Sequence, residues 1–359
     1  MSSIAPHGTN LPQSKSKKSL RLQMFMPESL VPVFLFVVAI PISMLMWIGH
    51  LAFSFFKETS RLDSDLAVVP PTRWLASTLI PLVIVLHALR KKQVSTSGAA
   101  LGSVIAFILS LASYSFLACL IAFFFSSSKA TKFRQEKKKK LEEHFKEGGQ
   151  RNWVQVLCNG GMAAQLSFLY ILDLGCGERP INFVDDYRGS WLNLGVLGAF
   201  ACCNGDTWAS ELGTVVGKAD PYLITSWRKV PRGTNGGVTI GGLIFSAAGG
   251  ALVGVFHYLA TIIFIDSQQL VLSPPQWPLI LAGALAGFFG SLLDSILGAS
   301  LQYSGVDERT GIVVERSGKG VRHISGIRFL DNHCVNLISS ITIGLLTPRL
   351  ANIFWPTGY

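Results

Sequence analysis

The stretch GAALGSVIAFILSLASYSFLACLIAFFF, residues 98–125, contains no acidic or basic residue and no histidine. A helix of about 20 mostly apolar residues is long enough to cross a bilayer. A membrane span takes this form because hydrocarbon offers no water to the backbone, and a helix satisfies its own amide and carbonyl groups. The stretch therefore predicts a transmembrane helix.

Other segments repeat this pattern along the chain. Three of them are long and nearly free of charge, with His50 or His257 as the only histidines: 33–56, 153–172 and 233–265. Four are shorter or interrupted, which favours tilted, broken or protein-covered helices: 74–89, 191–205, 276–293 and 333–347. The sequence predicts an all-α, polytopic transmembrane helical bundle of about eight membrane segments.

The overall composition agrees with a membrane protein. Hydrophobic residues make up 49% of the 359 residues and charged residues only 14%, with a mean hydropathy of +0.42. That is too much apolar surface for a domain that faces only water. We expect residues 1–29 to be a polar, basic, disordered tail without a cleaved signal peptide, and 30–359 to form one multi-pass membrane domain. The six cysteines have no metal-type spacing and are interpreted as small buried hydrophobic residues.

Loop charges orient the spans, because basic loops stay in the cytosol. Loop 129–151 is strongly basic, which predicts a cytosolic location. Counting forward places 206–232 and 303–332, also basic, on the same side, and the acidic loops 173–190 and 266–275 on the other.

Counting backward over three crossings gives a conflict. It puts the basic N-terminus and the basic residues at 90–92 on the side opposite loop 129–151. Either 74–89 is not a simple span or the charge rule fails at this short loop, and the side of the N-terminus stays open.

Polar residues follow the apolar segment 191–205 without an obvious loop. At helical spacing Asp206, Thr207, Ser210 and Glu211 form one polar arc. Asp206 and Glu211 are candidate catalytic residues and candidate ligands of a divalent cation such as Mg²⁺, which prefers oxygen ligands. The alternative is a solvated helix end, with Asp206 as a cap. Acids beside apolar sequence on both sides favour the functional interpretation.

A glycine-rich turn precedes the long segment that ends at 265. Lys229 and Arg232 supply positive charge, and glycine lets backbone amides approach an anion. We interpret this turn as a candidate phosphate-binding site, or equally as a glycine turn used for close helix packing. The proposed phosphate-binding residues are Lys229, Arg232, Gly233, Thr234, Asn235, Gly236 and Gly237.

Three further residues are candidates. Asp294 and Asp331 lie at the predicted cytosolic ends of the last two spans, where they can be catalytic acids or helix caps. Arg151 can bind phosphate through its planar guanidinium, or anchor the membrane interface together with Trp153.

These residues belong to longer sequence words that resemble a known family. The words include GGQRNWVQV at 148–156, GDTWASE at 205–211, GTNGGVT at 233–239, and the pairs Asp294-Ser295 and Asp331-Asn332. Over roughly residues 30–355 the chain is similar to the integral membrane family that contains animal transmembrane protein 19 and plant phytyl-phosphate kinase, and the animal branch is nearer.

The resemblance implies a chemistry. The plant member converts an isoprenyl monophosphate to the diphosphate, with CTP as its favoured donor, so the resemblance implies a CTP-dependent isoprenyl-phosphate kinase acting at an endomembrane. The alternatives are a transporter, because glycine-broken helices also build transport sites, and a non-enzymatic membrane protein. We expect the lipid bilayer, an isoprenyl phosphate and a nucleotide as partners, and no nucleic acid. The sequence predicts no oligomeric state.

Overall fold

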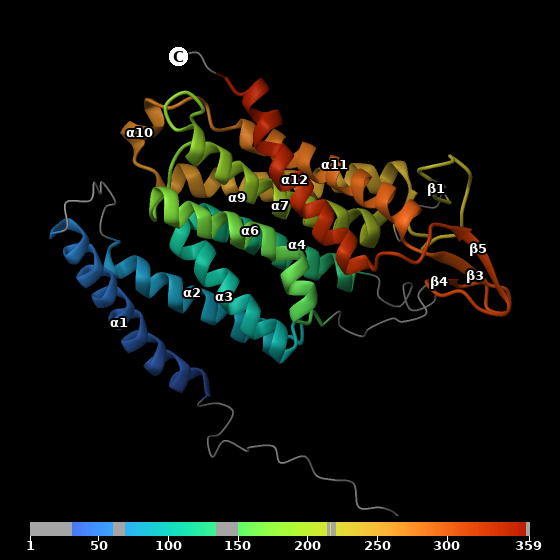
Figure 1. Ribbon diagram of the computed structural model, residues 1–359, viewed down its shortest axis with the longest axis horizontal. Coiled ribbons are helices and arrows are strands. Elements are labelled where there is room, and N and C mark those ends of the chain that lie inside the picture. The colour runs from blue at the N-terminus through green and yellow to red at the C-terminus, as the bar shows by residue number, and fades with distance from the viewer. Residues whose placement is uncertain (1–30, 60–68, 134–149, 214–215, 217–219, 357–359) are drawn as a thin grey trace, which may run out of the picture.

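The computed structural model describes residues 31–59, 69–133, 150–213, 216 and 220–356. It is a bundle of helices with small strands gathered at one end (Figure 1). The predicted tail 1–29 and most of loop 129–151 lie outside the described residues. The main helices are α1 Val31–Thr59, α2 Pro71–Arg90, α3 Thr96–Ala112, α4 Tyr114–Lys132, α6 Trp153–Leu174, α7 Tyr187–Trp208, α9 Ile240–Phe264, α11 Pro278–Leu301 and α12 Asn332–Phe354.

Within the described ranges, 7 helices are long and apolar enough to cross a membrane, namely α1, α2, α4, α6, α9, α11 and α12. The prediction of an all-α polytopic bundle is confirmed. Helix α7 is less apolar, yet all of its residues from 192 to 205 are buried. It lies at the centre, packed against α4, α6, α9, α11 and α12. A helix that contacts protein on every side does not need a lipid-compatible surface, which explains its interrupted sequence pattern.

The stretch 98–125 differs from its prediction, because two helices, α3 and α4, replace the single span. The helix breaks at Ser113, whose backbone is extended at φ −158° and ψ 139°, and whose hydroxyl accepts a hydrogen bond from the Ser115 amide. Glu178 fixes this break, since its carboxylate accepts from the Tyr114 amide at 2.8 Å and pairs with Arg73 at 2.5 Å. Composition cannot reveal such a break, because both halves are equally apolar.

The break places two loops at opposite ends of the bundle. Ala112 and Tyr114 lie with the loop around Glu178, at the end that carries the short helix α10, Ser267–Val271. The other end of α3 is joined to Arg151, whose carbonyl accepts from the Ser95 amide at 3.0 Å. We call these the α10 end and the sheet end. Helix α3 runs back along the bundle and brings Arg90, Lys91 and Lys92 to the same end as Arg151, which removes the conflict in loop charges for these three residues.

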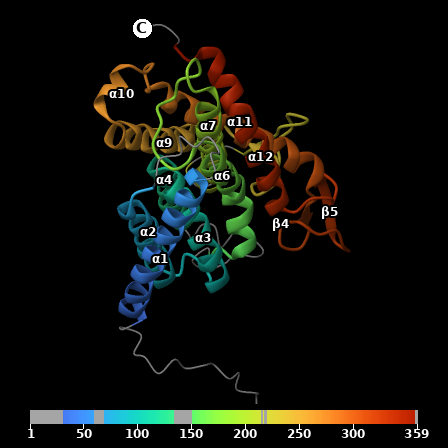
Figure 2. The same ribbon diagram turned by 60° about the vertical axis from the view of Figure 1, so that its left-hand side comes forward.

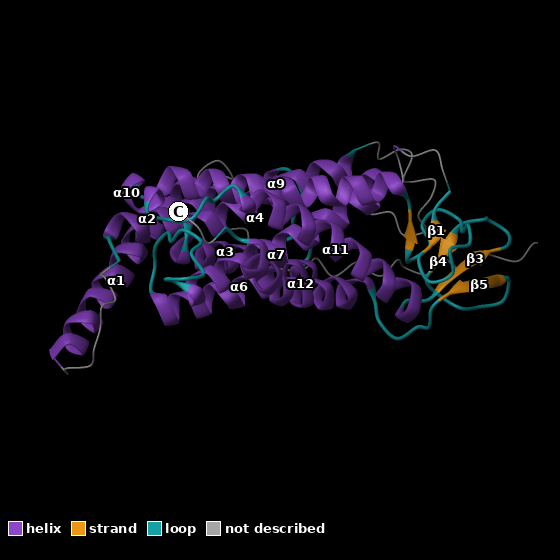
Figure 3. Cartoon of the chain, turned by 90° about the horizontal axis from the view of Figure 1, so that it is seen from above, coloured by secondary structure: helices purple, strands orange, loops and turns teal. Residues whose placement is uncertain are grey.

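Small antiparallel strands, absent from the sequence prediction, cover the sheet end (Figure 3). Strand β1 Tyr222–Leu223 pairs with β2 Gly237–Val238, and β3 Ser304–Asp307 lies between β4 Val313–Val314 and β5 Val321–Ser325. Leu223, Val230, Ala299, Val306 and Ile324 form a separate hydrophobic cluster beneath them. This cluster attaches the strands to the end of α11.

Glycines bring α7, α9 and α11 into close contact below the strands. A Cβ atom on Gly205 would lie 2.6 Å from the Cα of Gly287 and 2.8 Å from the carbonyl oxygen of Ser246. Gly250 and Gly254 of α9 face Gly283 and Gly287 of α11 in the same way. Small residues at this spacing let membrane helices approach closely. The contact fixes the position of Asp206, which follows Gly205 directly. Turning the molecule shows α1 outside this central packing (Figure 2).

Candidate functional site

The sheet end of α7 carries the first part of the site. After Trp208 the helix widens into the π-helical turn η2, Ala209–Gly213. Such turns are rare and occur frequently at functional sites. Asp206, Ser210 and Gly213 line a cavity of about 310 Å³, which we call the acidic cavity. Glu211 is not among its lining residues, so only part of the polar arc that α-helical spacing predicts faces this cavity.

Helix α11 contributes a second carboxylate to the acidic cavity. Asp294 lines it together with Ser291 and Ser295, and its charge interacts with that of Asp206. With its amide nitrogen turned toward Asp294, Asn336 of α12 donates to the carboxylate at 3.1 Å. Two acids from separate helices therefore line one cavity, although they are 88 residues apart in sequence, at 206 and 294.

The glycine turn forms the opposite wall of the acidic cavity. Gly233 and Gly236 have φ of 89° and 78°, a conformation that favours glycine. Gly236 also packs on α11, since a Cβ there would meet the Ser295 carbonyl oxygen at 2.5 Å. The amides of Thr234, Asn235 and Gly237 already donate to protein oxygens. The turn thus has a packing role, and its contribution to an anion site rests on its glycine conformation and on Arg232.

The predicted phosphate-binding residues separate in the structure. Arg232, with Gly233 to Gly237, lines the acidic cavity, whereas Lys229 lines neither of the two cavities at this end. Lys229 is exposed on the segment that pairs with Tyr222. Of the two predicted cations on this segment, only Arg232 is placed where a cavity-bound phosphate would be.

Arg151 is also separate from the two cavities. Its guanidinium donates to the hydroxyls of Ser127 at 2.9 Å and Ser128 at 3.2 Å, and lies 5.6 Å from the ring centres of Phe123 and Phe124. Desolvation lowers its pKa, and the charge of Glu211 opposes that shift. Arg151 therefore ties α4 to the chain before α6, while Glu211 lies within electrostatic reach of both Arg151 and Asp206.

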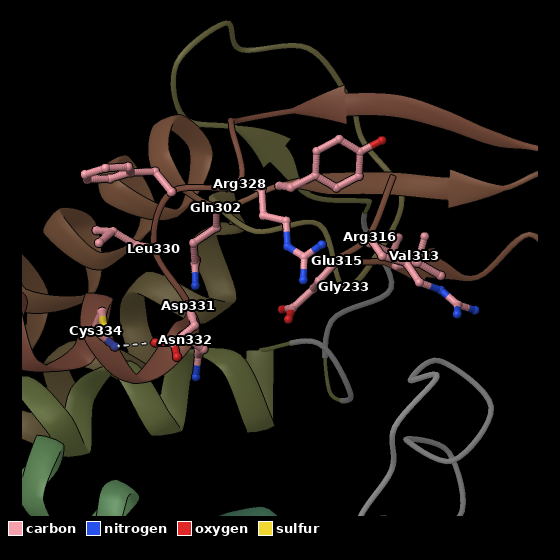
Figure 4. Close-up of a pocket in the computed structure, with 13 residues that line it drawn as sticks. Gly233, Gln302, Val313, Glu315, Arg316, Arg328, Leu330, Asp331, Asn332 and Cys334 are labelled. Atoms are coloured by element: carbon pink, nitrogen blue, oxygen red, sulfur yellow. Dashed lines mark hydrogen bonds between the residues drawn. The ribbon is translucent and has the colours of Figure 1, made fainter. Parts of the chain in front are cut away.

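A larger cavity of about 920 Å³ adjoins the acidic cavity and shares Gly233, Gln302 and Asn332 with it. We call it the basic cavity after Arg316 and Arg328, which line it together with the acids Glu315 and Asp331. Figure 4 shows the side chains of Arg328 and Glu315 pointing into it, with Asp331 and Cys334 at the start of α12. Asp331 accepts from the Cys334 amide at 2.8 Å, and this bond holds the pKa of the Asp331 carboxyl below its ordinary value. Asp331 is thus a helix cap that also lines the cavity.

Sequence reasoning missed part of this cavity. Arg316 and Arg328 were counted only as loop charges, and Tyr303 and Glu315 were not candidates. A signal was present, since four basic residues lie between 316 and 328 in one short loop. Only two of the four line the cavity, namely Arg316 after β4 and Arg328 after β5, whereas Lys319 and Arg322 are absent from its lining.

The acidic cavity suits a hard cation only with help from a ligand. Among the described residues, no group of three or more His, Cys, Asp or Glu side chains converges on one point. Asp206 and Asp294 provide carboxylate oxygens to the same space. Mg²⁺ is commonly bound by one or two carboxylates, waters and the phosphates of a substrate. The donor set fits such a shared site.

The fold and these two cavities define a polytopic membrane protein with a charged site at one end of its bundle. The chain belongs to the family described as integral membrane protein DUF92, whose model matches residues 79–344. The family resemblance is confirmed, as is a multi-pass location in a lipid bilayer.

Relatives share most of this length. The chain is 40% identical to Protein PGR of Arabidopsis thaliana over 79% of its own length and 98% of the relative's. It is 28% identical to an uncharacterized membrane protein of Methanocaldococcus jannaschii, over 76% and 92%. Protein VTE6, chloroplastic, of Arabidopsis thaliana is 27% identical over 65% of this chain and 57% of that protein. No solved structure matches.

Proposed function

We propose that the protein is a phosphotransferase that converts an isoprenyl-type lipid monophosphate to the diphosphate, with a nucleoside triphosphate as donor. One observation carries the proposal: Asp206 and Asp294 meet with Arg232 in a cavity that opens into the larger basic cavity. The family resemblance implies CTP as the donor. Carboxylates that could share a cation with a ligand, beside arginines that could bind phosphate oxygens, suit transfer between two phosphates.

The roles follow from the charges. An oxygen of the lipid phosphate attacks the terminal phosphorus of the donor, a new P–O–P linkage forms, and the bond to the nucleoside diphosphate breaks. This reaction needs alignment and charge neutralisation more than covalent help from the protein. Asp206 and Asp294 would hold Mg²⁺ against the phosphates, which neutralises their charge. Arg232, Arg316 and Arg328 would bind phosphate oxygens. No general base is needed, because the acceptor is already an anion.

The location of the cavities favours this function over transport. Secondary transporters bind their substrates near the middle of the membrane. Both cavities lie among the strands and helix termini of the sheet end. A lipid phosphate at the membrane surface and a water-soluble nucleotide can both reach this position.

The test uses the purified full chain in detergent with Mg²⁺, terminally labelled CTP and a panel of isoprenyl monophosphates. We expect label to appear in a lipid diphosphate, and to be lost when Mg²⁺ is chelated. Asp294→Asn should lose this transfer while retaining the detergent melting temperature of the parent. Absence of transfer with every donor and acceptor, together with no nucleotide binding in a titration, would reject the enzyme.

A further inference from the structure

A third cavity, of about 460 Å³, lies away from the charged site, between α4 and α9. The two helices lie side by side in the bundle (Figure 3). Ile121, Phe125, Leu252 and Phe256 give the cavity an apolar lining, and we call it the α4–α9 groove. Its α4 residues extend from Ile121 to Ala130, about 14 Å at 1.5 Å per residue, and Phe133 follows just after the helix. The groove is therefore elongated along α4 and mostly hydrophobic.

One positive charge lies at its sheet end. Lys129 lines the groove and is exposed. The Ser126 hydroxyl donates to Asn204 Oδ1 at 2.8 Å, which fixes α4 against α7. Lys129 is three residues beyond Ser126, and Thr207 is three beyond Asn204, on helices that run in the same direction. Lys129 therefore lies at the same depth as the residues that begin the charged site.

The groove and the acidic cavity share one segment of chain as their wall. Trp208 and Leu212 line the groove, whereas Asp206, Ser210 and Gly213 line the acidic cavity. The end of α7 and the π-helical turn η2 thus present apolar side chains to one side and polar groups to the other. A molecule with a long apolar chain and a phosphate could use both sides.

We infer that the α4–α9 groove holds the hydrocarbon chain of the lipid phosphate acceptor, with Lys129 meeting its phosphate. This inference rests on the proposed function and adds the position of the acceptor to it. The apolar lining favours the chain, and Lys129, the one basic residue among the described residues that line the groove, complements the phosphate. The bound lipid then approaches Asp206 from the membrane side, while the nucleotide occupies the basic cavity from the aqueous side.

A bulky substitution in the groove tests the inference, because it should impair long lipid acceptors more than short ones. Leu252→Trp adds bulk to the lining and should raise KM for a phytyl-type monophosphate about ten-fold, with KM for CTP unchanged. A single-isoprene monophosphate is too short to fill the groove, so its kcat/KM should stay within two-fold of the parent. Leu169→Trp is the control, because Leu169 is an exposed leucine on α6 that does not line the groove. Equal losses for long and short acceptors would overturn the inference.

A binding experiment separates this inference from the proposed function. A phytyl-type monophosphate carrying a photoreactive group on its chain should label peptides of α4 and α9, and excess phytyl monophosphate should prevent labelling. Lys129→Gln should weaken that competition about ten-fold, as expected for a lost charged hydrogen bond. Labelling of α4 and α9 without any phosphoryl transfer would support lipid binding in the α4–α9 groove and contradict the proposed kinase activity. Phosphoryl transfer together with labelling of helices other than α4 and α9 would show that the lipid chain does not bind in the α4–α9 groove.

Discussion

At the scale of single residues, the site depends on acids that lipid would not tolerate. Asp206 lies near the end of α7 and Asp294 lies about two turns before the end of α11, and both line the same cavity. Ionisable groups at such positions are costly and are usually retained for function. The nearby glycines have packing partners that explain them without a ligand, so the two acids are the stronger argument for chemistry.

Asp206→Asn should remove a metal ligand without changing the shape of the side chain. We expect kcat to fall on the order of 100-fold or more, as for loss of a preorganised electrostatic group, with an unchanged melting temperature. The measurement is phosphoryl transfer as a function of Mg²⁺ concentration. Asp266→Asn, at the α10 end, is the control and should keep the activity of the parent. If Asp206→Asn shows the same Mg²⁺ dependence as the parent, Asp206 is not a ligand.

Arg232→Gln should weaken binding of the phosphate-bearing ligands. A charged hydrogen bond contributes about 1.5–3 kcal/mol, which corresponds to a loss of affinity of about ten-fold or more. Lys229→Gln changes the same chain segment outside both cavities, and should stay within about two-fold, as for a surface substitution. Titrations with CTP and with an isoprenyl monophosphate measure the affinity of each of the two variants for each ligand. Equal effects of the two substitutions would show that position in the cavity does not matter.

The residue types of the site could be predicted from sequence better than their grouping. Asp206, Asp294 and Arg232 were candidates because acids and cations beside apolar helices are unusual. Their convergence could not be predicted, since it depends on the contact of Gly205 with Gly287 and on the π-helical turn. Glu211 shows the limit, because the sequence grouped it with Asp206 as a metal ligand, whereas it does not line the acidic cavity.

At the scale of elements, the bundle shows where hydropathy succeeds and where it fails. Long apolar helices such as α9 were predicted because lipid requires that pattern over their whole length. Stretch 98–125 was wrong as one span, because its break at Ser113 is decided by Glu178, an acid from a distant loop. The strands β3 to β5 were missed because their pairing is between loop residues, with few apolar positions to mark them.

The contact among α7, α9 and α11 predicts a specific sensitivity to added volume. Gly205→Ala places a methyl group 2.6 Å from the Gly287 Cα, and overpacking of this kind costs about 1–3 kcal/mol. Gly241→Ala is the matched control in α9, because nothing lies within 4 Å of its added Cβ. We expect a lower melting temperature in detergent for Gly205→Ala alone. Equal melting temperatures would mean that the helix contact is looser than described.

At the scale of the whole molecule, charge divides the two ends. The sheet end gathers basic residues from loops far apart in sequence, and Arg228 there donates to the Ile324 carbonyl. The α10 end carries Asp173, Asp185 and Asp186, and the Arg73–Glu178 pair is buried between α2 and the loop after α6. Since basic segments remain in the cytosol, this asymmetry predicts a cytosolic sheet end.

This division gives a topology that labelling can test. With α3 and α4 as separate crossings, single cysteines at Lys92 and Lys319 should react with an impermeant thiol reagent from one side of sealed vesicles, and a cysteine at Gln269 from the other. The experiment requires a background in which the six native cysteines are replaced, because Cys334 is exposed. Lys92 decides the question: a single span over 98–125 would put Lys92 and Lys319 on opposite sides, whereas the break at Ser113 puts them together. Labelling of Lys92 and Gln269 from the same side would therefore reject the two-helix arrangement. It would also restore the conflict between loop charge and crossing number, for which the residues at 90–92 would then need another explanation.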